Sequence, residues 1–553
     1  MRGSRGDGAS RLEVVIRWGA RRALPLLAGA WLAGCTVGPD FKSEAPWWQP
    51  TSWSGTRPTA PVEKVSLPVA APLDPKWWDQ FQDPELSALE QRVASENLDM
   101  RIADMRLGES RSQLGITQAN QYPILNADGS YSHQYLSPNG VVGLFPPAGA
   151  TSSGGGFGGI APGTTGTSFG SSGGSASGTA GTLGAIPLQG HTIPPFNLYQ
   201  YGFDAAWEVD FWGQVRRQVE AAKAMVQATE DQRRDSLVSI EAELARDYIN
   251  LRGVQRTLAI TEENLASANQ SLDLTRQRAS GGLTTDLDVA NAEAQASNIA
   301  AQLPPLREQE GQLINALSQL LGRPPGALKA ELAEAKPIPP VPPKVPMGLP
   351  SELARRRPDI RAAEASLHAA TAQVGVAISD FFPNVSLTGS FGISALNAYQ
   401  LGSLNSMQYG VGPTVSLPIF HGGQLVSTLA LRKQQQKEAA LTYQKTVLQA
   451  LNDVDNALIS YHTEQQRLAE LAKTVEAGRR ALDLARQRYV QGVATFLDVL
   501  TAQSVLLGAE VQQALSTALV STNLVALYKA LGGGWEQAYP DQPVVAAAGN
   551  PSL

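Results

Sequence analysis

An internal duplication constrains the fold of this chain more than any other feature of its sequence. Residues 272–278 recur at 482–488, which is a shift of 210 positions. Upstream of them, a second set of matches has a shift of 260. Repetition of this kind indicates that one structural unit occurs twice. We therefore expect the first repeat, 84–330, and the second, 350–535, to contain the same elements in the same order.

The two shifts differ by 50 positions because the first repeat contains extra residues between Tyr131 and Phe211. That interval includes the segment 138–190, which is rich in Gly, Ser and Thr. Such a composition is typical of flexible, low-complexity segments. It also explains a formal GxGxxG match at 154–159, because no strand is expected before that match and no helix after it. The segment is predicted to be an external loop insert.

Each repeat is predicted to contain two strands of about ten residues. Along 198–209, apolar side chains such as Tyr201 and Phe203 alternate with polar ones such as Asp204. A period of two with aromatic residues on the apolar face is typical of membrane β-strands, and a soluble sheet with one wet face is the alternative. The expected elements are a helix at 84–121, strands at 124–136 and 198–209, a long helix at 213–280 and a helix at 285–321, then a Pro-rich linker at 331–349, a helix at 350–381, strands at 385–396 and 408–419, a long helix at 423–490, a helix at 495–531 and a tail at 536–553.

Each long helix is predicted to end in a tight turn that leads into a second helix. Neither 213–280 nor 423–490 contains a Pro, and a helix of that length spans about 100 Å. Gly282 and Gly492 follow these helices, and Gly adopts the left-handed conformation of a helix C-cap without strain. A Thr followed three residues later by an acid is a capping-box pattern at a helix start. The pattern occurs as Thr285 with Asp288 and as Thr495 with Asp498.

The first 34 residues have the pattern of an export signal. Several Arg residues precede the apolar run 23–33, which is too short to span a bilayer. The run ends in small residues before Cys35, the only cysteine, and this resembles a bacterial lipobox. We therefore expect a signal peptide at 1–34, an N-acyl and a diacylglycerol lipid on Cys35, and an extended segment at 35–83. The alternative is a buried, inert Cys35 behind an uncleaved anchor.

Composition excludes several classes of function. The net charge of −6 gives no basic surface for nucleic acid. One cysteine and five scattered histidines offer neither a disulfide framework nor a zinc motif, so no metal and no cofactor is expected. No catalytic motif occurs, and the chain is therefore not expected to be an enzyme.

Four strands are too few to close a membrane barrel, for which eight is the lower bound. Open strand edges are not tolerated in lipid because their backbone groups stay unsatisfied. The chain must then oligomerise if its strands are in a membrane, and three chains give twelve strands around a water-filled lumen. The helices would extend this duct on the periplasmic side, because the anchor at Cys35 precedes them.

Motifs along nearly the whole chain resemble the outer-membrane factor family of tripartite efflux pumps, the TolC- and NodT-like lipoproteins. They are CTVGPD at 35–40, WWDQF at 77–81, WEVDFWG at 207–213, RRPDI at 356–360, PIF at 418–420 and LGGGW at 531–535. The resemblance implies a homotrimer in the outer membrane of a Gram-negative bacterium, with a twelve-strand β-barrel continued by a periplasmic α-helical barrel of coiled-coil type. The implied function is passive export of drugs or other small molecules. The implied partners are a periplasmic adaptor and a proton-driven inner-membrane transporter of the RND type.

The resemblance also implies a periplasmic tip that the helices of the second repeat close at rest. Carried over to this chain, the tip is 489–501, and the candidates for the pore constriction are Leu497, Asp498 and Thr501. Some relatives have an acid in place of Thr501. Asp498 has a second interpretation as an ordinary charge at a helix start, and Asp288 fits that interpretation better.

Three other functions remain to be compared with small-molecule efflux. The same fold could export proteins or metal ions, although the sequence has no Met or His cluster. A non-conducting periplasmic scaffold is possible, and channel conductance distinguishes it from a duct. A hydrolase is disfavoured by the missing catalytic residues.

Overall fold

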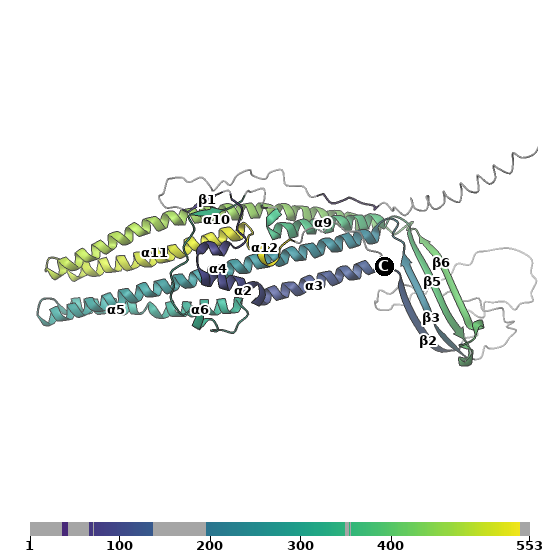
Figure 1. The fold of residues 1–553 in the computed structure, drawn as a ribbon, viewed down its shortest axis with the longest axis horizontal. Helices are drawn as coiled ribbons and strands as arrows, with labels where there is room; N and C mark the ends of the chain where they lie inside the picture. Colours follow the sequence, from purple (N-terminus) through teal and green to yellow (C-terminus); the bar gives the residue numbers. More distant parts are fainter. Residues whose placement is uncertain are drawn as a thin grey trace, which may run out of the picture. The chain divides into compact units, whose positions relative to one another are not determined.

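Figure 1 shows the computed structural model, which describes residues 36–42, 66–69, 71–135, 195–348, 353 and 355–541. The expected signal peptide, the lipidation site Cys35, the insert 138–190 and most of the tail lie outside the described residues. The chain forms two compact units, and each contains parts of both repeats. The helical unit comprises Met1–Gln121, Asp210–Pro383 and Leu417–Leu553, and the strand unit comprises Tyr122–Val209 and Asn384–Ser416.

The strand unit is one antiparallel sheet with the order β2-β3-β5-β6. Its strands are β2 (Ile124–Gln134), β3 (Phe196–Glu208), β5 (Asn384–Ala395) and β6 (Met407–Ser416), so strands occur in all four expected places. β6 ends at Ser416, earlier than the expected 419, because its partner β5 begins at Asn384, which pairs with Ser416. Pro413 is tolerated within β6 because this strand lies at the edge of the sheet.

The strand register gives the sheet one apolar face. Phe203 lies beside Phe391, which in turn lies beside Tyr409. All three side chains are exposed in the single chain. Polar and small residues form the other face, where Asp204 lies between Asn126 and Ser390. A sheet with an uncovered apolar face has the surface that lipid would cover.

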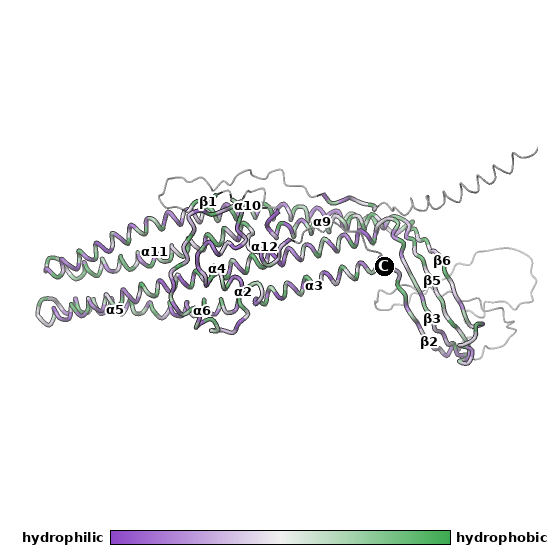
Figure 2. Tube along the Cα trace, in the orientation of Figure 1, coloured by the Kyte–Doolittle hydropathy of each residue, from purple (hydrophilic) through white to green (hydrophobic). Residues whose placement is uncertain are grey.

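The helical unit is built around two long helices, α4 (Gln214–Ser280) and α10 (Gln424–Val490), whose bounds differ by the predicted 210 positions. The pair α3 (Leu98–Ala119) and α9 (Pro358–Ser379) differs by the predicted 260. α4 packs against α3, α9 and the second long hairpin, and α10 packs against α9. Hydrophilic and hydrophobic residues are mixed along these helices (Figure 2), and no helix among the described residues is both long and apolar enough to cross a bilayer.

The helix expected at 84–121 is in fact two helices, α2 (Pro84–Glu96) and α3. They are separated by Asn97, whose backbone is extended and whose side chain accepts the N–H of Met100 at 3.0 Å. A side-chain cap of this kind starts a new helix. The equivalent residue of the second repeat, Arg357, is also extended, because the following Pro358 disfavours helix there. The expected helix 350–381 is therefore interrupted there as well, because residues 353, 355 and 356 are helical and α9 begins at Pro358.

The helix expected at 285–321 is also divided, into α5 (Asp286–Ala300) and α6 (Leu303–Leu320). Pro304 and Pro305 explain the division, because proline clashes with the carbonyl of the residue four positions earlier and has no N–H. In the second repeat Ala514 and Leu515 occupy these positions. α11 (Phe496–Ala530) is accordingly continuous.

The Pro-rich stretch 331–349 is more than a linker, because β4 (Lys344–Pro346) pairs in parallel with β1 (Leu67–Val69). The segment 35–83, expected to be extended, also contains the short 3-10 helix η2 (Trp77–Phe81). The two Trp side chains of η2 are buried in the main apolar core. Leu332 of the short helix α7 (Lys329–Leu332) and Trp535 of α12 (Trp535–Ala538) belong to the same core.

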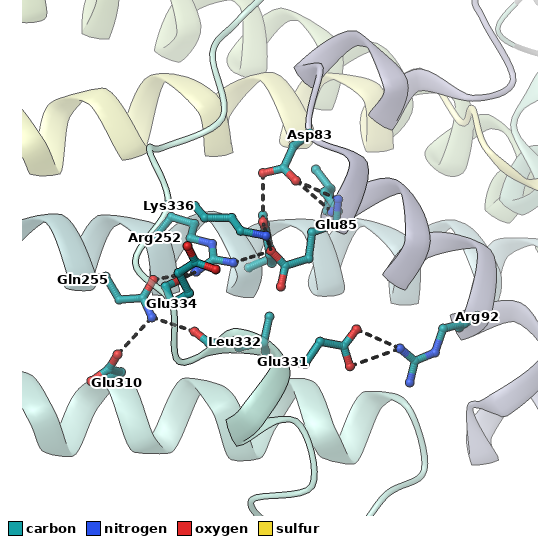
Figure 3. Close-up of polar contacts among 12 residues, drawn as sticks. Asp83, Glu85, Arg92, Arg252, Gln255, Glu310, Glu331, Leu332, Glu334 and Lys336 are labelled. Carbon is teal, nitrogen blue, oxygen red and sulfur yellow. Dashed lines mark hydrogen bonds and ion pairs between the residues drawn. The ribbon is translucent and has the colours of Figure 1, made fainter.

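Buried charges tie the Pro-rich stretch to α2 and α4 (Figure 3). The carboxylate of Glu85 accepts from Arg252 at 2.6 Å and from Lys336 at 2.7 Å. Arg252 also donates to the backbone carbonyl of Glu334 at 2.7 Å. Asp83 caps α2 and accepts the hydroxyl of Tyr248 at 2.8 Å. These contacts hold the connection between the repeats against the first long helix.

Candidate pore constriction at the hairpin tips

Both long helices end in the same turn, at the glycines that the sequence singles out. Gly282 has φ 72° and Gly492 has φ 74°. After α10, the N–H of Val493 donates to Arg488 C=O at 2.9 Å and that of Gly492 to Tyr489 C=O at 3.0 Å. This pair of bonds is a Schellman motif, which requires the left-handed residue. The turn after α4 has the same pair of bonds.

The acids that follow each turn cap the next helix. Asp498 accepts the backbone N–H of Thr495 at 2.9 Å and its hydroxyl at 2.8 Å. These bonds lower the pKa of Asp498. Asp288 accepts from the hydroxyl of Thr284 and from Thr285, and its pKa is lowered in the same way. Both carboxyls therefore carry a negative charge at the start of a helix, where the helix dipole favours it.

The three candidates for the constriction share one exposed side of α11. Leu497 is 65% exposed, and Asp498 and Thr501 are also exposed. Phe496 and Val499 point the other way and are buried. The hydroxyl of Thr501 donates back to the carbonyl of Leu497 at 2.8 Å, so only its acceptor lone pairs remain for other partners. The structure thus brings the three residues together, and their role in a pore stays a prediction.

The two hairpins are joined near their tips by a contact that the sequence did not predict. The guanidinium of Arg278 lies 4.7 Å from the centre of the Tyr489 ring and donates to the carbonyl of Val490 at 3.3 Å. Tyr489 is buried, with its ring 5.4 Å from that of Phe496. A shared apolar cluster that includes Leu272 and Leu482 continues the contact away from the tips. The repeat pairs Arg278 with Arg488, but no local pattern indicates which of the two contacts a tyrosine.

Exposed apolar side chains surround both turns. Leu283 and Leu287 are exposed on the first tip, and Val493 and Leu497 are exposed on the second. Four large apolar residues on two neighbouring turns form a surface suited to contact with protein. Among the described residues, no group of three or more His, Cys, Asp or Glu is placed to hold a metal ion.

Comparison with known proteins assigns this architecture to a family. The model of the outer membrane efflux protein family matches residues 162–323 and 349–533. The chain belongs to the outer membrane efflux protein family. The predicted resemblance is thereby confirmed, and with it the predicted function of efflux through an outer-membrane channel rather than catalysis. The expectation that no cofactor is needed agrees with membership of a family of channels.

Individual members of this family match over most of the chain. The solvent efflux pump outer membrane protein SrpC of Pseudomonas putida is 30% identical over 516 residues, which cover 93% of this chain and 98% of SrpC. The solved structure of the outer-membrane channel OprN is 31% identical, with a TM-score of 0.77, and covers 91% of this chain and all of that chain. A structure described as the open state of the Neisseria gonorrhoeae outer membrane channel MtrE is 26% identical, with a TM-score of 0.69, and covers 91% of this chain and 99% of that chain.

Proposed function

We propose that this chain is the outer-membrane duct of a tripartite efflux pump and works as a lipid-anchored homotrimer. The observation that carries this proposal is the four-stranded sheet with two open edges, β2 and β6. Lipid leaves the backbone groups of such edges unsatisfied. Other copies of the chain are the simplest partners that satisfy them.

The direction of the strands supports closure by identical copies. Because the four strands alternate in direction, β2 and β6 run antiparallel to each other. β6 of one copy can therefore pair with β2 of the next and continue an antiparallel sheet. Three copies give twelve strands, which is wide enough for an aqueous lumen. The apolar face with Phe203, Phe391 and Tyr409 then faces lipid, and the face with Asp204 faces water.

In the trimer, Leu497, Asp498 and Thr501 form the constriction of the periplasmic tip. Three copies of the exposed side of α11 meet around one axis and narrow the path by apolar contact and by a ring of carboxylates. Opening moves the second hairpin away from the first, which breaks the contact between Arg278 and Tyr489. A relative whose structure is described as an open state supports a tip with two positions.

The exposed apolar tips are the contact surface for a periplasmic adaptor, which links the duct to a proton-driven inner-membrane transporter of the RND type. A duct of this kind has no substrate pocket of its own, and the inner-membrane partner selects the cargo. We propose small apolar organic molecules and drugs as the cargo, because SrpC is named a solvent efflux protein. Acylation of Cys35 anchors the N-terminus in the outer membrane.

Single-channel recording of the purified protein in planar bilayers tests the gate. Leu497→Ala removes the apolar ring at the second tip and is expected to raise conductance at rest. Leu287→Ala is the matched control, because it is the same residue at the same place in the first repeat and is 68% exposed. Equal conductance of both variants and the wild type would refute the constriction. A particle that contains one chain, measured by light scattering in detergent, would refute the trimer.

A further inference from the structure

The residues directly after Cys35 are bound to the helical unit rather than free. The N–H of Val37 donates to the carbonyl of Trp212 at 3.1 Å. Thr36 lies against Gly213, the N-cap of α4, which has φ 81°. A Cβ added to Gly213 would lie 3.0 Å from the Cα of Thr36. The segment that follows Cys35 therefore lies against the N-terminal end of α4.

A buried arginine holds this segment. The side chain of Arg217 on α4 is only 4% exposed. Its Nε donates to Val37 C=O at 3.3 Å, and its Nη2 donates to Gly38 C=O at 3.4 Å and to the Asp40 carboxylate at 2.6 Å. Its Nη1 donates to Glu220 at 2.7 Å. Three of these four bonds go to residues 37–40, and the fourth holds the guanidinium to α4.

The segment also fits α9 by shape. Gly38 has φ 104°, and a Cβ there would lie 2.5 Å from the Cα of Gly375, so only glycine allows this approach. A Cβ on Gly375 would lie 3.1 Å from the side chain of Arg217. Beyond the glycine, Phe41 stacks on His368 of α9 with ring centres 4.6 Å apart. His368 in turn donates to Glu220 at 2.9 Å.

The duplication provides an internal comparison. Gly115 and Gly423 are the repeat equivalents of Gly375 and Gly213, and in the described chain a Cβ on either would meet nothing within 4 Å. Ser427 stands in the position that corresponds to Arg217. The arginine and the close backbone contacts therefore belong to the docked segment and are not a requirement of the repeated helices.

We propose that residues 36–42 form a clasp that fixes the lipid-bearing N-terminus at the start of α4, with Arg217 as its receptor. Because Cys35 is bonded to Thr36, the acyl chains would then be attached at a fixed place around the trimer and would not hang on a free tether. The partner that this surface recognises is the chain's own N-terminal segment. The membrane consequence rests on the proposed acylation of Cys35, whereas the docking rests only on the contacts of 36–42.

Hydrogen–deuterium exchange of the detergent-solubilised, full-length protein tests the clasp. In the wild type the amide of Val37 is expected to be protected. Gly38→Ala and Arg217→Gln are each expected to speed the exchange of this amide roughly tenfold or more. Arg217→Gln removes the charge-assisted bonds to residues 37–40, and Gly38→Ala removes the space for the close approach to Gly375. Gly38→Ala lies outside the helices and so leaves the bundle folded. Gly115→Ala makes the same type of change at the repeat equivalent of Gly375, where a Cβ meets nothing within 4 Å in the described chain, and it should leave the exchange of Val37 unchanged.

Two results would overturn the clasp, namely exchange of Val37 in the wild type at the rate of a free peptide, or unchanged protection in both variants. Cys35→Ser separates this proposal from the lipid anchor, because protection of Val37 should persist without acylation. The mass of the N-terminal peptide reports acylation, and conductance reports the channel. A wild type that is protected at Val37 but not acylated would support the clasp and would contradict the proposed anchor.

Discussion

The guanidinium of Arg252 lies entirely out of solvent and 2.6 Å from the carboxylate of Glu85. The pair joins the first long helix to the start of α2, and Lys336 of the Pro-rich stretch binds the same carboxylate oxygen. Removal of one member of a buried ion pair leaves the other charge without compensation. The integrity of the helical unit is therefore expected to depend on this contact.

Arg252→Ala is predicted to destabilise the protein by about 3–5 kcal/mol, the range for breaking a buried pair. Arg246→Ala is the control on the same helix, because Arg246 is half exposed and its ion pairs are worth about 1 kcal/mol or less. Thermal unfolding followed by circular dichroism compares the two variants. Similar melting temperatures for both would show that the buried network contributes little.

Two buried carboxyls predict a loss of stability as the pH rises. Glu90 is 1% exposed, and neither of its oxygens has a hydrogen-bond partner among the described residues. Burial, and then the nearby Glu241, raise the pKa of Glu90 well above its ordinary value. Burial, and then Glu536, raise the pKa of Glu241 in the same direction. The folded chain therefore keeps protons that the unfolded chain releases near its ordinary pKa of about 4.3.

The stabilisation from these protons is complete below the ordinary pKa and is lost as the pH rises through the folded pKa. The melting temperature of the wild type is expected to fall over this range, and Glu90→Gln should flatten the fall because an amide does not ionise. Glu476→Gln changes an exposed acid and should not alter the slope. Parallel pH profiles of the wild type and Glu90→Gln would argue against the protonated state.

Asp498 and Asp288 cap equivalent helices, so a comparison of their variants distinguishes an effect of capping from an effect on the pore. Asp498→Ala and Asp288→Ala remove equivalent caps, so they should lower the melting temperature by similar amounts. Only Asp498→Ala is expected to change the resting conductance and the cation selectivity, because the proposed constriction consists of second-repeat residues. Conductance changes of equal size in both variants would assign Asp498 to capping alone.

Deletion of residues 140–188 is predicted to leave trimer assembly and conductance intact. The strands on either side of this segment meet at their ends, since Gln134 pairs with Phe196. A short loop can therefore replace the long one with little change in closure entropy. Native gel electrophoresis measures assembly of the deletion variant beside the full-length protein. Loss of the trimer would contradict an external loop in this position.

The sequence predicts the elements that depend on local pattern. Alternation in 198–209 and 385–396 marks two central strands, and a glycine followed by a capping pair marks both turns. The repeat adds further information, because the bounds of α4 and α10 are related by the same shift as the residues. The break between α5 and α6 could have been predicted from Pro304, because proline interrupts a helix, although the apolar periodicity continues across it.

Contacts between distant segments could not be predicted in this way. The approach of Gly38 to Gly375 depends on how the N-terminal segment docks on α9, and the position of Arg278 over Tyr489 depends on how helices of different repeats pack. One sequence does not carry that information. The break at Asn97 is a similar case, because an asparagine can either continue a helix or cap a new one. Here its side chain accepts the N–H of Met100 and caps α3.

The unequal division of the two hairpins has a mechanical consequence. α5 and α6 are jointed at the prolines, whereas α11 continues for 35 residues, or about 50 Å, from Phe496 to Ala530. A helix that is interrupted by proline can bend at the interruption, whereas a continuous helix moves as one rigid element. A displacement at the Ala530 end of α11 is therefore expected to reach Leu497, whereas the equivalent displacement in the first repeat can be taken up by bending at Pro304 and Pro305.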